Sequence, residues 1–297
     1  MKNIILITGC SSGFGLLFTK SLALKGHVIY ASMRNITGKN AKIAEELRIF
    51  AQEKKVDIHV IDIDVTDEAS ADSAVESIIS EHGHIDVLIN NAGISSLGVM
   101  EAYSMDDFRR VFDVNVMGTF LLTRKVIPHM RERKNGLIIN QSSSLGRFTI
   151  PLTSVYNASK WAIEALTESW NYEFKEFNID SVMLEAGVFP NTDMRNKAKQ
   201  YAPSNEEVIY EYEEMLRVML NYMKVMKVWQ DKDLIVPPEV VAEKVCELVD
   251  SEPGSRPLRV LIDPIHEEAL NLFSPHYKKM QEFVLRGVDL EKYSELI

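Results

Sequence analysis

Short runs of aliphatic and β-branched residues alternate with longer amphipathic stretches over the first 190 residues of this 297-residue chain. The runs are nearly continuous in apolar residues, which is typical of strands buried on both faces of a sheet. The expected strands are residues 3–8, 28–32, 57–63, 87–90, 137–141 and 181–185, and the expected helices are 13–25, 40–55, 68–81, 105–133 and 155–177. Because parallel strands are joined by right-handed crossovers, this order predicts an α/β fold with a doubly wound parallel sheet covered by helices on both faces.

The pattern changes after Pro190. Residues 191–235 carry no strand signal, and a helix near 238–250 and a strand near 258–262 then resume the alternation. We therefore expect one domain, with a core of residues 1–190 and 236–265, a helical insertion at 191–235 and a C-terminal tail at 266–297. Methionines recur at helical spacing from Met215 to Met226, which is more typical of a core-facing helix than of a pocket wall.

The composition excludes several classes of protein. Hydrophobic residues make up 46% and charged residues 26%, as in ordinary globular proteins. The net charge of −10 disfavours nucleic acid as the main partner. Two cysteines cannot form a disulfide framework, and the chain contains no apolar run long enough for a membrane helix and no signal peptide. These features predict a soluble, cytoplasmic protein without a membrane partner.

A glycine-rich turn follows the first strand, with Gly9, Gly13 and Gly15 ahead of a helical stretch. Glycines let backbone N–H groups approach a pyrophosphate, and the helix that follows offers the positive end of its dipole. The turn therefore indicates a dinucleotide site, although a tight turn without a ligand would also explain it if it stood alone.

Four further motifs follow in order along the chain. Asn90-Asn91-Ala92-Gly93 closes the fourth strand, Asn115 stands in Asp-Val-Asn-Val, Ser143 in Gln-Ser-Ser-Ser, and Tyr156 and Lys160 in Tyr-x-x-x-Lys. With the Gly-x-x-x-Gly-x-Gly spacing of the turn, the set resembles the short-chain dehydrogenase/reductase family. That resemblance implies a Rossmann-type fold, a nicotinamide dinucleotide cofactor and an oxidoreductase.

The Tyr-x-x-x-Lys pair has a chemical rationale. A helix presents Tyr156 and Lys160 on one face, one turn apart. A tyrosine ordinarily titrates at about pH 10, and a neighbouring ammonium and an oxidised nicotinamide ring both lower that pKa. Tyr156 is thus expected to act as the general acid and base in the interconversion of a carbonyl and an alcohol.

The resemblance gives roles to two more residues. Ser143 corresponds to the serine that hydrogen-bonds the substrate oxygen; Ser142 and Ser144 are rivals that side-chain alternation points elsewhere. Asn115 corresponds to the asparagine that distorts a helix and holds a water next to Lys160, whereas taken alone it is equally well a helix-start residue.

The second strand ends in Met33-Arg34, without the carboxylate that an NAD site uses to bind the ribose 2′-hydroxyl. Arg34 is suited to a 2′-phosphate, so NADP(H) is preferred over NAD(H); a surface arginine is the alternative. Asp62 and Asp64 share a strand face, but no further ligand follows at metal spacing, and we predict no metal.

The resemblance also implies a set of cofactor contacts. They are Gly9, Ser11, Ser12, Gly13, Phe14, Gly15, Arg34, Asp64, Val65, Asn91, Ala92, Gly93, Tyr156, Lys160, Gly187, Val188 and Thr192. Two positions depart from the family pattern: Ala186 replaces a proline, and Thr192 lies one place later than usual, with Asn191 as an alternative. Ser95, Ser96 and Phe148 are expected near the mouth of the pocket.

The predicted function is NADP(H)-dependent interconversion of a carbonyl and a secondary alcohol on a small molecule. If the methionine stripe faces the site, the substrate is apolar and bulky, such as a steroid-like, retinoid or other large ketone. The alternatives are an NADP(H)-sensing regulatory protein and a sugar-nucleotide epimerase, whose first loop normally has a different glycine spacing. Assembly through residues 105–133 and 155–177 predicts a homodimer or homotetramer.

Overall fold

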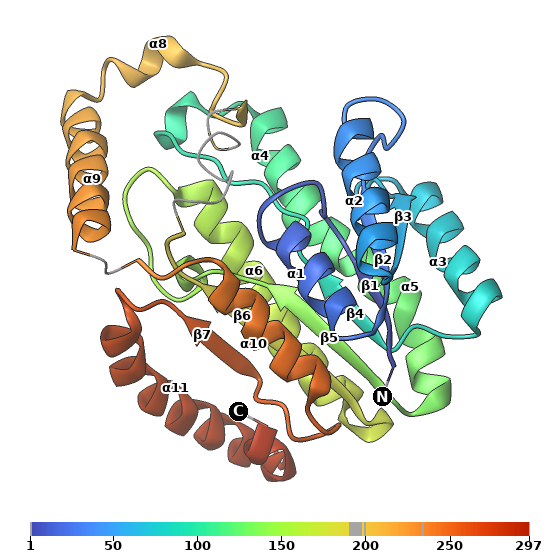
Figure 1. Ribbon diagram of the computed structural model, residues 1–297. Helices are drawn as coiled ribbons and strands as arrows, with labels where there is room; N and C mark the ends of the chain where they lie inside the picture. Colours follow the sequence, from blue (N-terminus) through green and yellow to red (C-terminus); the bar gives the residue numbers. More distant parts are fainter. Residues whose placement is uncertain (1, 190–197, 199, 233–234, 297) are drawn as a thin grey trace.

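A seven-stranded sheet forms the centre of the computed structural model, which describes residues 2–189, 198, 200–232 and 235–296. The strand order is β3-β2-β1-β4-β5-β6-β7, and every neighbouring pair is parallel (Figure 1). The strands are β1 (Ile4–Ile7), β2 (Val28–Met33), β3 (Asp57–Asp62), β4 (Val87–Asn90), β5 (Gly136–Gln141), β6 (Ile179–Ala186) and β7 (Arg259–Ile262). The predicted strands and the doubly wound parallel sheet are confirmed.

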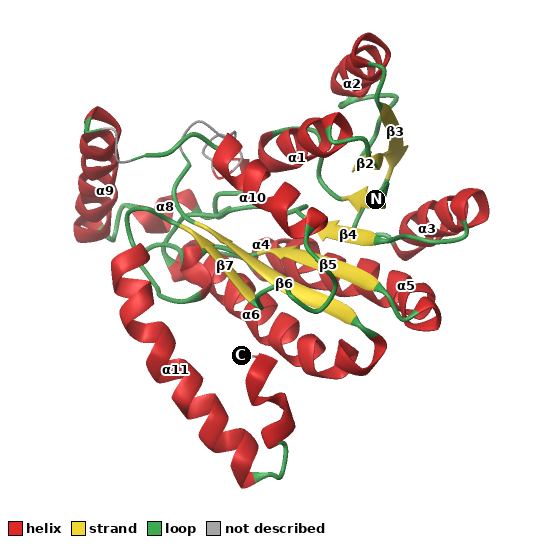
Figure 2. Cartoon of the chain, turned by 60° about the horizontal axis from the view of Figure 1, so that its bottom comes forward, coloured by secondary structure: helices red, strands yellow, loops and turns green. Residues whose placement is uncertain are grey.

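Helices cover both faces of this sheet (Figure 2). They are α1 (Gly13–Leu24), α2 (Ala41–Lys54), α3 (Glu68–His82), α4 (Met105–Phe112), α5 (Gly118–Arg133), α6 (Ser154–Phe174), α8 (Glu206–Ile209), α9 (Glu213–Asp231), α10 (Glu239–Asp250) and α11 (Glu267–Gly287). Short 3-10 helices lie at Met100–Ala102, Ser144–Gly146, Lys175–Phe177 and Glu291–Leu296. None of the helices in the described part of the chain is long and apolar enough to cross a membrane.

Alternation along the strands divides the hydrophobic core in two. Ile5 and Ile7 of β1 face a cluster that includes α1, α2 and α10, whereas Ile4 and Leu6 face one that includes α3, α5 and α6. The chain reverses its direction of winding between β1 and β4, which are hydrogen-bonded neighbours. In open parallel sheets, ligands bind outside the carboxyl ends of the strands at this kind of reversal.

Residues 105–133 were expected as one helical stretch, and that expectation needs a correction. The structure has α4, a π-helical turn at Asp113–Met117 and then α5. Ser104 and Asp107 form a capping box that fixes the start of α4. The π-helical turn contains Asn115, whose side chain is bound outside the helix, as described below.

The segment after β7 is helical. Helix α11 runs beside β7 at the edge of the sheet, and the 3-10 helix Glu291–Leu296 returns to the C-terminal half of α6 (Figure 2). There the Asn171 amide donates to the Leu296 carbonyl at 3.2 Å, and the rings of Tyr172 and Tyr293 lie 5.8 Å apart. The expected tail therefore packs as an ordered layer along one side of α6.

Candidate active site

Tyr156 and Lys160 lie on the first turns of α6, next to the end of β5. Both are buried, and the Lys160 ammonium lies 5.7 Å from the centre of the Tyr156 ring. The ammonium donates to the carbonyl oxygen of Gln141 at 2.7 Å, which ties α6 to the last residue of β5. The side chain of Ser143, two residues further, interacts with Tyr156 and lowers its pKa. The fold thus brings these three predicted residues together.

Burial dominates the ionisation of this pair. It raises the pKa of Tyr156 to about 12, against a smaller lowering by the hydrogen bond with Ser143. It lowers the pKa of Lys160 to about 8, opposed by the charge of Glu164. The expected lowering of the Tyr156 pKa is therefore wrong for the protein without cofactor, because burial raises this pKa by more than the neighbouring side chains lower it.

Asn115 lies within the π-helical turn Asp113–Met117. Its side-chain oxygen accepts from the Ile94 N–H at 2.8 Å, and its amide donates to the Ile94 carbonyl and to the Ser159 hydroxyl, both at 2.9 Å. The side chain thereby joins the β4–α4 loop to α6. The alternative of a helix-start residue is wrong, since Asn115 lies between two continuous helical segments.

Gly93 keeps open the space between Asn115 and Lys160. A Cβ atom at this position would lie 3.4 Å from the Asn115 side-chain oxygen and 3.9 Å from the Lys160 nitrogen. Gly93 is exposed, while the two side chains beside it are buried. The polar groups of Asn115 and Lys160 are therefore reached from the surface past a residue without a side chain.

The glycine-rich turn is locked against the Asn-Asn-Ala-Gly segment. Gly15 has no room for a side chain, because a Cβ atom there would lie 2.5 Å from the Asn91 amide nitrogen and from the Gly9 carbonyl oxygen. The Asn91 amide donates to the Thr8 carbonyl at 2.8 Å, and the Thr8 hydroxyl accepts from the N–H groups of Asn91 and Ala92, both at 2.9 Å. Thr8 thus holds the glycine-rich turn against the Asn-Asn-Ala-Gly segment, a role that the sequence pattern does not indicate.

The start of α1 fits an anionic group. Gly9 and Gly13 have φ values of 73° and 57°, in the left-handed region that favours glycine. No acidic residue lies in the first turn of α1, so the positive end of the helix dipole is not compensated there. Ser11 and Ser12 are half-buried beside it. These residues fit the pyrophosphate of a dinucleotide.

The neighbouring side chains keep this turn rigid. Phe14 packs edge-on against Phe189 at 5.2 Å and stacks on Phe18 at 5.9 Å. The Cys10 thiol is fully buried, and burial raises its pKa to about 12. Cys10 is therefore a packing residue of the turn and not a nucleophile.

Arg34 and Asp64, both predicted cofactor contacts, pair with each other across the ends of β2 and β3. Their side chains are partly exposed, and the guanidinium lies 3.5 Å from the carboxylate. Burial raises the pKa of Asp64, but hydrogen bonds from Thr66 and the charge of Arg34 outweigh it and lower the pKa. Val65 is buried, and a Cβ atom on Gly118 would lie 2.8 Å from its side chain.

Asp62, the other half of the considered metal pair, caps a turn. Its carboxylate accepts from the N–H groups of Asn35 and Ile36 at 3.0 and 3.2 Å. Among the described residues, no group of three or more His, Cys, Asp or Glu side chains is placed to hold a metal ion. The turn geometry explains why a second carboxylate occurs here.

At the end of β6, Gly187 is pressed against Asp263. A Cβ atom on Gly187 would lie 2.3 Å from the carboxyl carbon of Asp263, and the Gly187 N–H donates to the Ile262 carbonyl at 2.9 Å. Val188 is half-buried beside it. The predicted contact Thr192 and its alternative Asn191 lie outside the described residues.

The rivals of Ser143 face other parts of the molecule. The Ser144 side chain interacts with Asp263, and a Cβ atom on Gly146 would lie 2.9 Å from both the Ser142 hydroxyl and Glu164. Of the three serines, Ser143 is the one whose side chain lowers the pKa of Tyr156 in the part of the chain that the structure describes. The assignment of Ser143 to the substrate oxygen stays a prediction.

The insertion is hydrogen-bonded to α4 and to the loop before it. Asp107 accepts from the Ser204 N–H at 3.0 Å and from its hydroxyl at 2.7 Å. The buried Ser96 hydroxyl lies 2.6 Å from the Tyr103 hydroxyl and donates to the Tyr201 carbonyl at 2.6 Å. The contacts of Asp107 with Ser204 and of Ser96 with Tyr201 gave no recognisable signal in the sequence, because they span 97 and 105 residues.

Aromatic side chains connect the end of α9 to the loop after Ser143. His266 lies 5.0 Å from Phe148 and 5.8 Å from Trp229, measured between ring centres. Met226 is the one side chain of α9 that is buried, while Met223 is exposed. The methionine stripe is thus not buried along its length, as a core-facing helix would be.

Comparisons with known proteins agree on a family. Residues 3–202 match the profile of the short chain dehydrogenase family. The chain is 36% identical over 195 residues to a 3-ketodihydrosphingosine reductase from Bacteroides thetaiotaomicron, covering 65% of this chain and 67% of that protein. A short-chain dehydrogenase structure from Streptomyces avermitilis superposes with a TM-score of 0.69 at 25% identity and covers 97% of this chain and 98% of its own.

A further solved structure contains a cofactor. The gluconate 5-dehydrogenase from Burkholderia cenocepacia, in complex with NADP and tartrate, is 30% identical with a TM-score of 0.59, covering 64% of this chain and 73% of that one. This similarity supports a nicotinamide dinucleotide as the cofactor of the present chain.

Proposed function

The chain belongs to the short-chain dehydrogenase family and is an oxidoreductase, and from this premise we propose that it interconverts a carbonyl group and a secondary alcohol with NADP(H). The observation that carries the proposal is the convergence of Ser143, Tyr156 and Lys160 at the carboxyl end of β5. These residue types match proton transfer to an oxygen atom, and no nucleophile is required.

When bound, the reduced cofactor supplies a hydride to the carbonyl carbon. The residues of this chain bind and protonate the oxygen of the substrate carbonyl. The Ser143 hydroxyl hydrogen-bonds it, and Tyr156 donates a proton to it, so that hydride and proton together give the alcohol. In the reverse direction Tyr156 accepts the proton. Because the protein alone raises the pKa of Tyr156 to about 12, the phenolate depends on the added positive charge of the oxidised ring.

The proton on Tyr156 is renewed from solvent in this proposal. Lys160 is one turn away on α6, and its nitrogen and the Asn115 side chain flank the exposed Gly93. Water can occupy a polar space of this kind and connect buried groups to the surface. Asn115 is accordingly given a role in proton supply and not in hydride transfer.

NADP(H) is proposed as the preferred cofactor because β2 ends in Met33, where an NAD site places a carboxylate, and Arg34 follows directly. The 30% identical gluconate 5-dehydrogenase is a complex with NADP, which supports this choice. Arg34 is paired with Asp64 at 3.5 Å. The guanidinium must therefore exchange, or share, this carboxylate when it binds a 2′-phosphate.

The proposed substrate is apolar and bulky. Two aromatic groups are proposed to border the site: Tyr103 and Tyr201, which contact Ser96, and Phe148 and Trp229, which lie against His266. The 36% identical relative carries the name of a reductase for a long-chain keto compound, 3-ketodihydrosphingosine. A steroid-like, retinoid or long-chain ketone fits this surrounding better than a sugar, which needs many polar contacts.

The alternative function is an NADP(H)-sensing binding protein with no turnover. Decrease of NADPH absorbance with a panel of apolar ketones, for the wild type and for Tyr156→Phe, separates the two. We expect turnover in the wild type that the variant loses while it still binds NADPH. Equal NADPH binding with no turnover in either protein, over the whole panel and in both directions, would favour the sensor.

A further inference from the structure

The helix face that carries Tyr156 and Lys160 continues with ionisable side chains at every fourth residue, namely Glu164, Glu168 and Tyr172. Residues four apart are neighbours on an α-helix, so this row leads away from the site along α6. Glu164 is 5% exposed and Glu168 is 6% exposed. Carboxylates buried to this extent need partners, which lie on three other elements.

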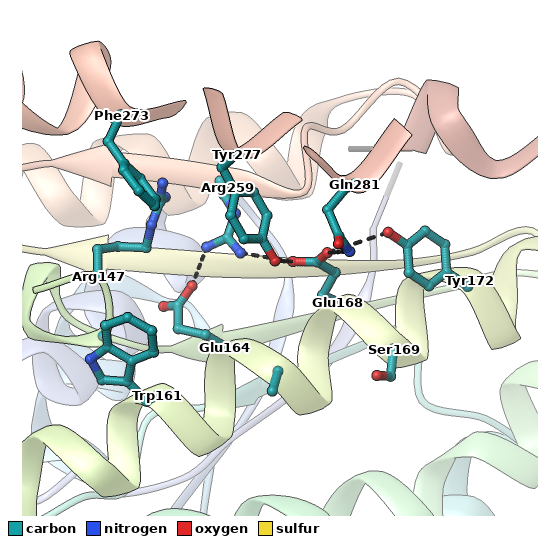
Figure 3. A pocket seen from close by; sticks show the side chains of 12 residues that line it. Arg147, Trp161, Glu164, Glu168, Ser169, Tyr172, Arg259, Phe273, Tyr277 and Gln281 are labelled. Atoms are coloured by element: carbon teal, nitrogen blue, oxygen red, sulfur yellow. Dashed lines mark hydrogen bonds and ion pairs between the residues drawn. The ribbon is translucent and has the colours of Figure 1, made fainter. Parts of the chain in front are cut away.

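Arg259 of β7 is the centre of this cluster (Figure 3). Its guanidinium pairs with Glu164, with Glu168 at 2.9 Å and with Glu185 of β6 at 2.7 Å. Arg147, in the loop after β5, pairs with Glu185 at 3.2 Å. Three carboxylates thus face two guanidinium groups, which leaves one carboxylate without a full counter-charge inside the cluster.

Helix α11 covers the cluster and fixes Glu168. The Tyr277 hydroxyl and the Gln281 amide donate to the two carboxylate oxygens of Glu168 at 2.9 and 2.7 Å (Figure 3). Arg147 lies 5.5 Å from the Phe273 ring centre. A cavity of about 270 Å³ remains between α6, β7 and α11, and none of the four candidate catalytic residues lines it.

The missing counter-charge is one helical turn away. Lys160 is 5% exposed, and its ammonium donates to a neutral group, the Gln141 carbonyl, at 2.7 Å. In the part of the chain that the structure describes, Glu164 is the acid whose charge favours the protonated form of Lys160. When Glu164 is ionised, the excess carboxylate and the buried ammonium therefore balance each other along α6.

We propose that Glu164 is a positioning residue of the active site, which keeps Lys160 in its ammonium form through space and is itself held by the Arg259 cluster beneath α11. The inference deepens the proposed function, since it assumes that Lys160 acts together with Tyr156. Glu164 touches neither substrate nor cofactor, and its effect passes through Lys160.

The ionisation of both groups supports this role. Burial and the charge of Glu185 raise the pKa of Glu164 to about 8, with Arg259 opposing, while burial lowers the pKa of Lys160 to about 8. Two interacting groups that titrate over one range behave as a pair. As the pH rises, Glu164 becomes negatively charged, and this charge raises the pKa of Lys160. The other charged groups that face them are Glu168, Glu185, Arg147 and Arg259.

The test reads Lys160 directly. The full chain is produced with lysine labelled with ¹³C at Cε, the Lys160 signal is assigned by its loss in Lys160→Arg, and its shift is followed against pH. We expect Glu164→Gln to lower the Lys160 pKa by about one unit, as for loss of a unit charge at about one helical turn in a protein interior. Glu168→Gln is the matched control, because it removes the same charge from Arg259 one turn further away.

The control should lower the Lys160 pKa by less than half as much, and Glu164→Asp, which keeps the charge, should titrate like the wild type. An unchanged Lys160 pKa in Glu164→Gln, or an equal shift in Glu168→Gln, overturns the inference. If Glu164→Gln does not fold, the width of the wild-type Lys160 titration curve decides. A curve broader than that of one independent group supports coupling to Glu164, and a curve with the width of one independent group contradicts it.

The titration needs no substrate, so its outcome is separate from that of the ketone assay. A chain that reduces no ketone but shows the shift contradicts the proposed function alone. Once a substrate is known, the pH profile of alcohol oxidation supplies a second measurement. Its rising limb should move to higher pH in Glu164→Gln and less in Glu168→Gln, because a less charged Lys160 stabilises the Tyr156 phenolate less well.

Discussion

Replacing Arg34 by alanine should weaken the binding of NADPH by about 10- to 30-fold and leave the binding of NADH within about twofold. A charge-assisted hydrogen bond contributes about 1.5 to 3 kcal/mol. In the free protein the guanidinium already pairs with Asp64 at 3.5 Å, and both side chains are partly exposed. Such a pair is worth about 0 to 1 kcal/mol, and its loss on binding reduces the net effect to about 0.5 to 3 kcal/mol, with a central value of about 1.8 kcal/mol.

The same geometry predicts an effect of opposite sign for the partner. Asp64→Asn keeps the shape of the side chain and its hydrogen bonds but removes the charge that competes for Arg34. We expect NADPH to bind up to about fivefold more tightly, corresponding to about 1 kcal/mol. Arg48→Ala is the matched control, since Arg48 is also an arginine in an exposed pair, with Glu45 on α2.

The measurement is the fluorescence of bound NADPH and NADH, titrated at low and at moderate salt for all four proteins. The preference of the wild type for NADPH should fall as salt rises, because salt screens exposed charges. Equal weakening of NADPH and NADH binding in Arg34→Ala would refute the assignment of Arg34 to the 2′-phosphate. The same loss in Arg48→Ala would show that only the overall charge matters.

Three other predictions follow from the site. Tyr156→Phe should reduce turnover by more than about 1,000-fold with NADPH binding within about threefold, measured by absorbance and fluorescence; turnover within tenfold of the wild type would exclude proton transfer by this residue. Burial opposes the ionisation of Asp107, but hydrogen bonds from Ser204 and Ser104 lower its pKa to about 2, so the stability it contributes is present above about pH 4 and is lost as the pH falls towards 2. Urea unfolding should therefore find Asp107→Asn less stable by about 2 kcal/mol at pH 7, with a difference that shrinks at low pH, and a constant difference would contradict this. Phe120 on α5 and Trp161 on α6 are exposed, and glutamate at either position should shift sedimentation of a dimer or tetramer towards the monomer; a wild type that sediments only as a monomer rejects the proposed assembly.

The sheet was predictable because its signal is local. A parallel strand buried on both faces must be continuously apolar, as in Ile4–Ile7 and Val28–Met33, and a run of this kind is visible without knowledge of its neighbours. The motif residues could also be placed near one another, since the ends of parallel strands meet at one edge of a sheet. Side-chain alternation favoured Ser143 over its neighbours, and this choice stays a prediction.

What could not be predicted depends on contacts between distant residues. The π-helical turn at Asp113–Met117 exists because the Asn115 side chain binds both backbone groups of Ile94, 21 residues away. The contact of Asp107 with Ser204 spans 97 residues. Local propensity carries no information on either pair, so the residue pattern predicts one helical stretch where the chain changes its winding. Only the resemblance of Asn115 to the family asparagine indicated a distorted helix there.

The row of ionisable residues on α6 could be predicted in part. Its spacing was visible in the sequence, since Glu164 and Glu168 follow Lys160 at intervals of four. Its meaning was not, because the spacing alone equally fits a solvated helix face. Only the position of Arg259, 95 residues beyond Glu164, turns the row into a buried cluster.

This arrangement changes the physical role of the C-terminal segment. At a rise of about 1.5 Å per residue, the carboxylate of Glu168 lies roughly 18 Å along α6 from Tyr156, too far for contact with a substrate. Helix α11 instead holds Glu168 in place through Tyr277 and Gln281. In the proposal made above, α11 therefore acts on Lys160 only through the Arg259 cluster that positions Glu164, and this indirect role is why a segment without any catalytic motif belongs to the description of the active site.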